Sequence, residues 1–107
     1  MTLFDKSNFN KHMNHFGQKI RELRESQNLL LRQVAAATEA DTALISKIER
    51  GERLATRAQV IAIAKFLHVG EYDLLTLWLA DKIEATLVNE PEVAYKALII
   101  ATQKLKK

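Results

Sequence analysis

Apolar residues recur along the chain every three or four positions, which is the spacing of one face of an α-helix. In residues 15–27, for example, Phe16, Ile20 and Leu23 fall on a common face. No stretch of useful length alternates apolar and polar residues as a half-buried strand does. The pattern therefore predicts an all-α fold, with helices over residues 15–27, 31–38, 42–50, 57 to about 70, 71–88 and 91–105.

Residues with strong preferences for helix ends support these boundaries. Asp41 and Thr56 precede predicted helices, where a side-chain oxygen can accept a hydrogen bond from a free backbone N–H. Gly51 suits the left-handed conformation that ends a helix, and Pro91 suits a first helical position. Residues 1–14 are mostly polar and are expected to form an arm or a short extra helix.

Residues 29–57 carry the clearest functional signal. Two short predicted helices are separated there by only Thr38 to Asp41. Helices so short, joined by so brief a turn, must cross steeply, as in the helix-turn-helix that offers its second helix to the DNA major groove. Ala35 falls where the crossed helices touch most closely. The pattern indicates a sequence-specific protein that binds double-stranded DNA.

The composition excludes several other classes of protein. The 107 residues suffice for one modest core. The absence of Cys excludes disulfides, thiolate metal sites and cysteine catalysis, and it suits a reducing cytoplasm, where we expect the protein to act. Apolar runs are only a few residues long, so no segment is expected to span a membrane, and nothing near Leu3 resembles a signal peptide.

The net charge of +3 is unevenly distributed. Up to Gly70, eleven Lys and Arg face seven Asp and Glu, giving +4; from Glu71 onward, five face six, giving −1. The basic excess thus accompanies the predicted DNA-binding segment. An excess of this size also occurs on ordinary solvated surfaces, so the charge supports the motif without identifying a partner by itself.

The stretch from Phe16 to Leu75 resembles the lambda-repressor-like DNA-binding domain of the Cro and Xre group. The matching segments are IRELR at 20–24, VA at 34–35, ISKIERG at 45–51 and AKFL at 64–67. The resemblance implies a five-helix helix-turn-helix domain, here residues 15–75, with residues 76–107 as a C-terminal extension containing an additional helix. Glu39 departs from the family, which usually has Gly at this turn position because it tends to need a positive φ.

The resemblance also implies which residues meet DNA. The exposed early positions of the second motif helix would face base edges: Thr42, Ala43, Ser46 and Lys47. Leu44 beside them could reach a thymine methyl or pack in the core. Arginines at the end of this helix and in the next loop, together with the start of the preceding helix, would contact phosphates: Arg32, Gln33, Arg50, Arg53 and Arg57. For each arginine the alternative is a solvated side chain near Glu49 or Glu52.

Arg24 and Glu49 have a different expected role. In the resembling domains, residues at these positions form a partly buried ion pair that ties the first helix to the reading helix. We expect that structural role here, rather than a direct DNA contact.

The C-terminal helices carry more apolar residues than one stripe each. A domain of this size cannot bury them all, and a monomer rarely exposes them. We therefore expect a homodimer, which would match a palindromic operator. The dimerisation residues are expected to be Leu79, Ile83, Leu98 and Ile99. A monomer closed by a helical hairpin and a surface for another protein partner remain alternatives.

The sequence gives little indication of metal binding or catalysis. His12 and His15 could share a helix face, but no Cys and no nearby carboxylate pattern completes a metal site. No His lies near a plausible nucleophile, and no Gly-rich phosphate loop occurs, so we expect no enzyme and no cofactor. The sequence predicts a transcriptional regulator, a repressor or autoregulator; the alternatives are an antitoxin that neutralises a toxin and the controller protein of a restriction-modification system.

Overall fold

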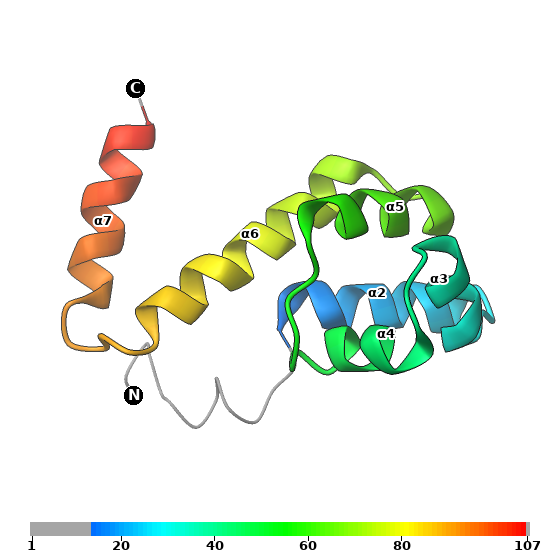
Figure 1. The fold of residues 1–107 in the computed structure, drawn as a ribbon. Helices are drawn as coiled ribbons and strands as arrows, with labels where there is room; N and C mark the ends of the chain where they lie inside the picture. Colours follow the sequence, from blue (N-terminus) through cyan, green and yellow to red (C-terminus); the bar gives the residue numbers. More distant parts are fainter. Residues whose placement is uncertain (1–13, 107) are drawn as a thin grey trace.

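The computed structural model describes residues 14–106, and these residues form six helices and no strand (Figure 1). The helices are α2 (His15–Ser26), α3 (Leu31–Ala37), α4 (Thr42–Glu49), α5 (Arg57–Leu67), α6 (Glu71–Leu87) and α7 (Ala94–Leu105). The all-α prediction is therefore confirmed. The predicted arm or short helix over residues 1–14 lies, except for Asn14, outside the described residues.

Helices α2 to α5 and the first half of α6 enclose one apolar core. Each of these helices contributes at least one residue to the core, so all of them take part in burying it. Its buried side chains are Phe16, Ile20, Val34, Ala35, Ile45, Ile48, Ala55, Val60, Ile63, Ala64, Leu67 and Leu74.

Side-chain caps fix where the helices of this domain begin. Asn14 Oδ1 accepts a hydrogen bond from the Gly17 N–H at 2.7 Å, and Asp41 Oδ1 accepts one from the Leu44 N–H at 2.7 Å. Thr56 and Gln59 cap each other reciprocally, with bonds of 2.9 and 3.1 Å between side chain and backbone. The predicted caps Asp41 and Thr56 are confirmed, because each supplies an acceptor to an otherwise unpaired N–H.

Two helix boundaries differ from the sequence prediction. Helix α5 ends at Leu67 rather than near Gly70, because His68 takes the left-handed conformation at φ 61°. Helix α7 begins at Ala94 rather than at Pro91, since residues 91–93 form a turn. Pro91 is compatible with a turn as well as with a helix start, so its presence alone did not decide the boundary.

The turn between α3 and α4 has the strained conformation that the sequence predicts. Glu39 lies at φ 54°, a region that favours Gly. The Ala40 N–H then donates to the Ala35 carbonyl at 2.9 Å and closes the end of α3. Gly51 at φ 77° ends the segment after α4, as expected.

Gly17 marks the closest approach between α2 and α4. A Cβ on Gly17 would lie 2.8 Å from the Glu49 carbonyl oxygen and would collide with that of Ile48. Both neighbours are backbone atoms, which cannot rotate away. The two helix backbones can approach this closely only because residue 17 has no side chain.

Helix α6 is anchored to the domain along one side. The Trp78 indole N–H donates to the Ala55 carbonyl at 2.7 Å, and the Lys82 ammonium lies 4.4 Å from the centroid of the indole ring. One turn further, the buried Asp81 carboxylate accepts the N–H groups of His15 and Phe16 at 2.8 and 2.9 Å. Asp81 thus caps α2 from a distant part of the chain. Burial raises its pKa, while these two donors act in the opposite direction.

Helix α7 stands apart from the domain. Figure 1 shows the C-terminal half of α6 projecting from the core, with α7 turning away beyond it. Only Ala94 of α7 is buried, and Leu98 is half-buried. No helix among the described residues is long and apolar enough to cross a membrane.

Candidate nucleic-acid interface

Helix α4 is held by one face and presents the other. Ile45 and Ile48 are fully buried in the core, whereas Thr42, Ala43 and Lys47 are exposed. Helical spacing separates these two sets because residues three and four apart share a face. The exposed set begins at the N-terminal end of α4, which is the end that a reading helix points at base edges.

A buried ion pair ties α4 to α2. Arg24 donates from Nε to Glu49 Oε2 at 2.7 Å and from Nη2 to Oε1 at 3.1 Å. Its Nη1 donates to the Leu29 carbonyl at 2.9 Å. The side chains of Arg24 and Glu49 are only 12% and 5% exposed, so neither charge is available to DNA. The structure therefore contains the pair that the resemblance implied, in a position that fixes the C-terminal end of α4.

The crossing of α3 and α4 has the expected steric basis. Ala35 is 3% exposed and belongs to the core on which both helices pack. Leu44 is half-buried and packs against the same core. A packing role thus accounts for Leu44, which the sequence left open between the core and a thymine methyl.

Arg50 lies beside the predicted base-reading residues. Its Nη1 donates to Ser46 Oγ at 2.6 Å, while Nε and Nη2 donate to the two oxygens of Glu52 at 2.8 and 3.2 Å. The pairing raises the pKa of Arg50 and lowers that of Glu52. Both side chains are exposed, so the pair is weakly held. Arg50 thus has a carboxylate partner, which was the alternative to a phosphate contact. A DNA phosphate would have to displace Glu52 from Arg50.

The other predicted phosphate contacts lie on the surface. Arg32, Arg53 and Arg57 are exposed. Gln33 is exposed too, but its Oε1 accepts the Leu30 N–H at 2.7 Å, so part of the side chain closes the start of α3. Leu30 itself supplies no side-chain cap there.

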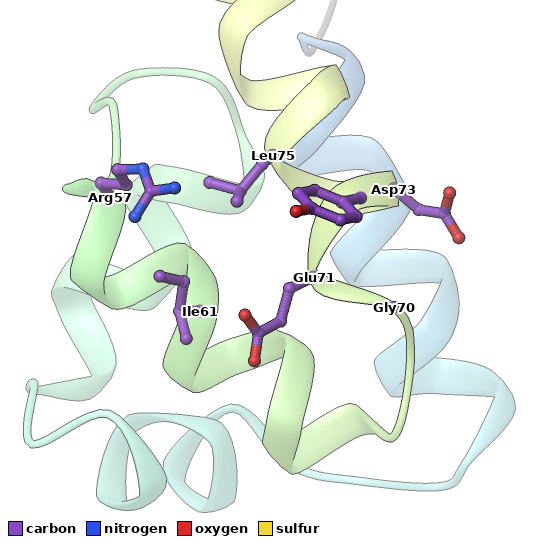
Figure 2. Close-up of a pocket in the computed structure, with 7 residues that line it drawn as sticks. Arg57, Ile61, Gly70, Glu71, Asp73 and Leu75 are labelled. Carbon is purple, nitrogen blue, oxygen red and sulfur yellow. The ribbon is translucent and has the colours of Figure 1, made fainter.

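Arg57 also lines an open groove between the starts of α5 and α6. Figure 2 shows Arg57 and Leu75 reaching toward each other, with Ile61 and Glu71 along the same hollow. Basic, acidic and apolar groups meet in this groove without converging on one type of ligand. The groove is therefore part of the surface around Arg57 and has no features of a separate ligand site.

The prediction that no carboxylates accompany the histidines is wrong for His15. Helix α6 brings Asp81 and Glu84 next to it, so that one ligand atom from each of the three lies within 4.8 Å of the others. His15 Nε2 is 2.7 Å from Glu84 Oε2, and both Asp81 oxygens accept backbone N–H groups. These bonds give the cluster a structural role in joining α2 to α6. His12 lies outside the described residues.

Comparison with known proteins identifies the class. A family model described as a helix-turn-helix domain matches residues 15–77, more than half of the chain. The chain belongs to this helix-turn-helix family and is a DNA-binding transcriptional regulator, which confirms the predicted class.

A solved structure gives a more particular likeness. The crystal structure of the restriction-modification controller protein C.AhdI from Aeromonas hydrophila is similar at 29% sequence identity, with a TM-score of 0.52. The match covers 55% of this chain and 89% of the controller protein. The lambda-repressor-like resemblance and the helix-turn-helix fold are thereby confirmed. A comparison with curated proteins found no significant match.

Proposed function

We propose that this regulator binds a short palindromic operator as a homodimer and acts as a repressor or autoregulator. The observation that carries the proposal is the asymmetry of α4. Its buried side and the Arg24–Glu49 pair hold it rigidly, while Thr42, Ala43 and Lys47 are exposed with Ser46 beside them. A rigidly held helix with short polar side chains and one Lys on its open face suits the major groove.

Within this proposal the exposed side chains have separate tasks. Lys47 donates to guanine acceptors, and Thr42 and Ser46 bond base edges or contact a thymine methyl. Ala43 offers apolar contact only. Arg32, Gln33, Arg53 and Arg57 contact phosphates and supply affinity without sequence information.

Arg50 has a task of its own in this scheme. Its guanidinium is bonded to Ser46, so it reaches DNA next to the base-reading residues. It exchanges Glu52 for a phosphate on binding. The proposed regulator performs no catalysis and acts in the cytoplasm, where it meets the DNA of its own genes.

A restriction-modification controller is the second candidate. The likeness to C.AhdI favours it, because the compared region contains a domain of the same kind at 29% identity. Both candidates bind DNA through α4. They differ in which genes they control. Transcription from the promoter of the chain's own gene, measured with and without the protein, separates repression from activation.

Selection of binding sites from random duplexes tests the proposal. We expect enrichment of an inverted repeat with half-sites about 34 Å apart, one helical turn of the duplex. Enrichment of no sequence above background would overturn the proposal of sequence-specific binding.

Two substitutions then separate readout from affinity on the selected operator. Lys47→Ala should cost about 1–3 kcal/mol and relax preference at one base position in each half-site. Arg53→Ala should weaken binding to selected and random DNA alike and reduce the dependence of log K on log salt by roughly one. Equal losses on both DNAs for Lys47→Ala would move Lys47 to the phosphate contacts.

A further inference from the structure

Glu52 places a negative charge within the surface that is proposed to contact DNA. Helix α4 and the loop after it, residues 42–56, contain three basic residues and two acidic ones, Glu49 and Glu52. The Glu49 carboxylate is buried and paired with Arg24. The Glu52 side chain is instead 55% exposed. Within this segment, Glu52 is therefore the one acidic side chain that can meet the phosphates.

The backbone of Glu52 is held at the end of α4. The Glu52 N–H donates to the Lys47 carbonyl at 2.9 Å, and the Gly51 N–H donates to the Ile48 carbonyl at 3.1 Å. With Gly51 at φ 77°, these two bonds form a Schellman motif, a common way for a helix to end. The motif fixes the direction in which the Glu52 side chain leaves the backbone. The carboxylate can change rotamer, but it stays close to the end of α4 as long as the two bonds hold.

The Glu52 carboxylate occupies the side of Arg50 that a phosphate would use. Its two oxygens accept from Arg50 Nε and Nη2 at 2.8 and 3.2 Å, a paired geometry that suits a phosphate as well as a carboxylate. The pKa of Glu52 is lowered first by the hydrogen bond from Arg50, and the charges of Arg50 and Lys47 act in the same direction. One carboxylate thus opposes two cations of the proposed interface.

We propose that Glu52 competes with DNA phosphates for Arg50 and thereby sets the DNA affinity of this regulator. The inference rests on the proposed function, in which Arg50 exchanges Glu52 for a phosphate. After the exchange, the carboxylate remains near the end of α4, unpaired and beside phosphates that repel it. Glu52 therefore weakens the part of the affinity that is independent of sequence, and binding depends more on the base contacts of α4.

The competition also changes how binding depends on salt. A phosphate neutralised by an unpaired arginine releases a condensed cation, which makes log K fall with log salt by about 0.9 per contact. At Arg50, the displaced carboxylate attracts a cation in its turn, so the exchange releases little net salt. The salt dependence of binding is therefore shallower than the number of basic contacts alone would give.

Glu52→Gln tests the competition, because it keeps the size of the side chain and removes its charge. Affinities for the selected operator and for a random duplex are measured by fluorescence anisotropy between about 50 and 200 mM salt. At the lower salt, we expect binding to both duplexes to be about fivefold tighter for each α4 that contacts DNA. The slope of log K against log salt should steepen by about one per contacting helix, so the gain should shrink about threefold over this range.

Two controls accompany this variant. Glu25 is 56% exposed and pairs with Arg21 at 3.3 Å, but it lies on α2, outside the proposed DNA contacts. Glu25→Gln should therefore change either affinity by less than about twofold and leave the slope unchanged. Arg50→Ala removes the cation for which Glu52 competes. Adding Glu52→Gln to Arg50→Ala should leave the slope unchanged and give less than half of the gain seen with Arg50 present.

Two results would contradict the competition. Unchanged affinity and slope for Glu52→Gln would mean that Glu52 does not compete with phosphates for Arg50. Weaker binding to the operator, with relaxed preference at one base position, would mean that Glu52 positions Arg50 to read a base.

The random duplex makes this result separable from that of the proposed function. A protein that selects no operator, but binds the random duplex more tightly after Glu52→Gln, retains the competition and loses the proposed sequence-specific binding. A protein that selects a palindrome, but gains nothing from Glu52→Gln on either duplex, retains sequence-specific binding and loses the competition.

Discussion

The domain formed by α2 to α5 and the first half of α6 differs from the segment formed by the rest of α6 and α7 in how apolar residues are used. In the domain, Ile45, Ile63 and Leu67 are covered almost completely. In the C-terminal segment, Leu79 and Tyr95 remain about half exposed, although α7 is as apolar as α4 and α5 of the domain. Both regions are helical, but among the described residues only the domain covers its apolar side chains with its own helices.

This difference separates two tasks. The domain can hold α4 in one orientation without help, because the buried pair of Arg24 and Glu49 and the close contact at Gly17 fix it to α2. The C-terminal segment leaves much of its apolar surface uncovered by the other described residues. Substitutions in the domain should therefore change the free energy of unfolding, whereas those in α7 should change association.

The largest effect is expected from Glu49→Ala in the domain. It leaves the Arg24 guanidinium poorly solvated and without its carboxylate partner, which should lower the unfolding free energy by about 3–5 kcal/mol. Arg24→Met combined with Glu49→Leu should recover most of that loss, because no charge is then stranded. Urea unfolding of the variants measures both. A loss below about 1 kcal/mol for Glu49→Ala would mean that the pair does not hold α4.

A smaller loss, about 3 kcal/mol, is expected from Gly17→Ala, since the new methyl would meet the backbone carbonyls of Ile48 and Glu49. Gly70→Ala is the matched control. Its added Cβ would meet only the Asp73 carboxylate, at 3.2 Å, and its φ of −66° suits any residue. The control should change the unfolding free energy by less than about 0.5 kcal/mol. Equal losses for the two variants would show that α2 and α4 can move apart cheaply.

In the C-terminal segment, Ile99→Asp should give a monomer and lower operator affinity on the order of 30-fold, because the two half-sites no longer combine in one binding event. Ile100→Asp introduces the same charge one residue along, at a side chain that is already 68% exposed against 40% for Ile99. It should remain dimeric. Light scattering and an operator titration compare the two. The distinction between these positions fails if both variants dissociate equally.

The smallest effect is expected from Glu39→Gly in the turn between α3 and α4. Glycine removes the strain at φ 54° but has more freedom to lose on folding, so the two terms should cancel to within about 0.5 kcal/mol. Thermal and urea unfolding of the variant check this. A loss of several kcal/mol would reveal a contact of the Glu39 side chain that matters more than its backbone.

Many features of the domain could be predicted from the sequence because they depend on interactions between residues that are close together in the chain. The caps Asp41 and Thr56 act within three residues of themselves, and the left-handed positions of Glu39 and Gly51 follow from the turn that each must make. Helical spacing alone also divided α4 into a buried side and an exposed side. The start of α7 was missed, since Pro91 fits a turn as well as a helix.

The tertiary structure alone decided the contacts between segments far apart in the chain. Gly17 matters because the backbone of α4 passes over it, and Asp81 matters because it caps α2 from 66 residues away. Nothing in the neighbouring sequence marks either residue, since the partner atoms belong to other helices. Helical periodicity indicates that one face of a helix is apolar. It does not indicate which residues cover that face. For that reason the sequence determined the helices and the exposed face of α4, whereas the three-dimensional packing determined how α4 is held and that the other described helices leave α7 uncovered.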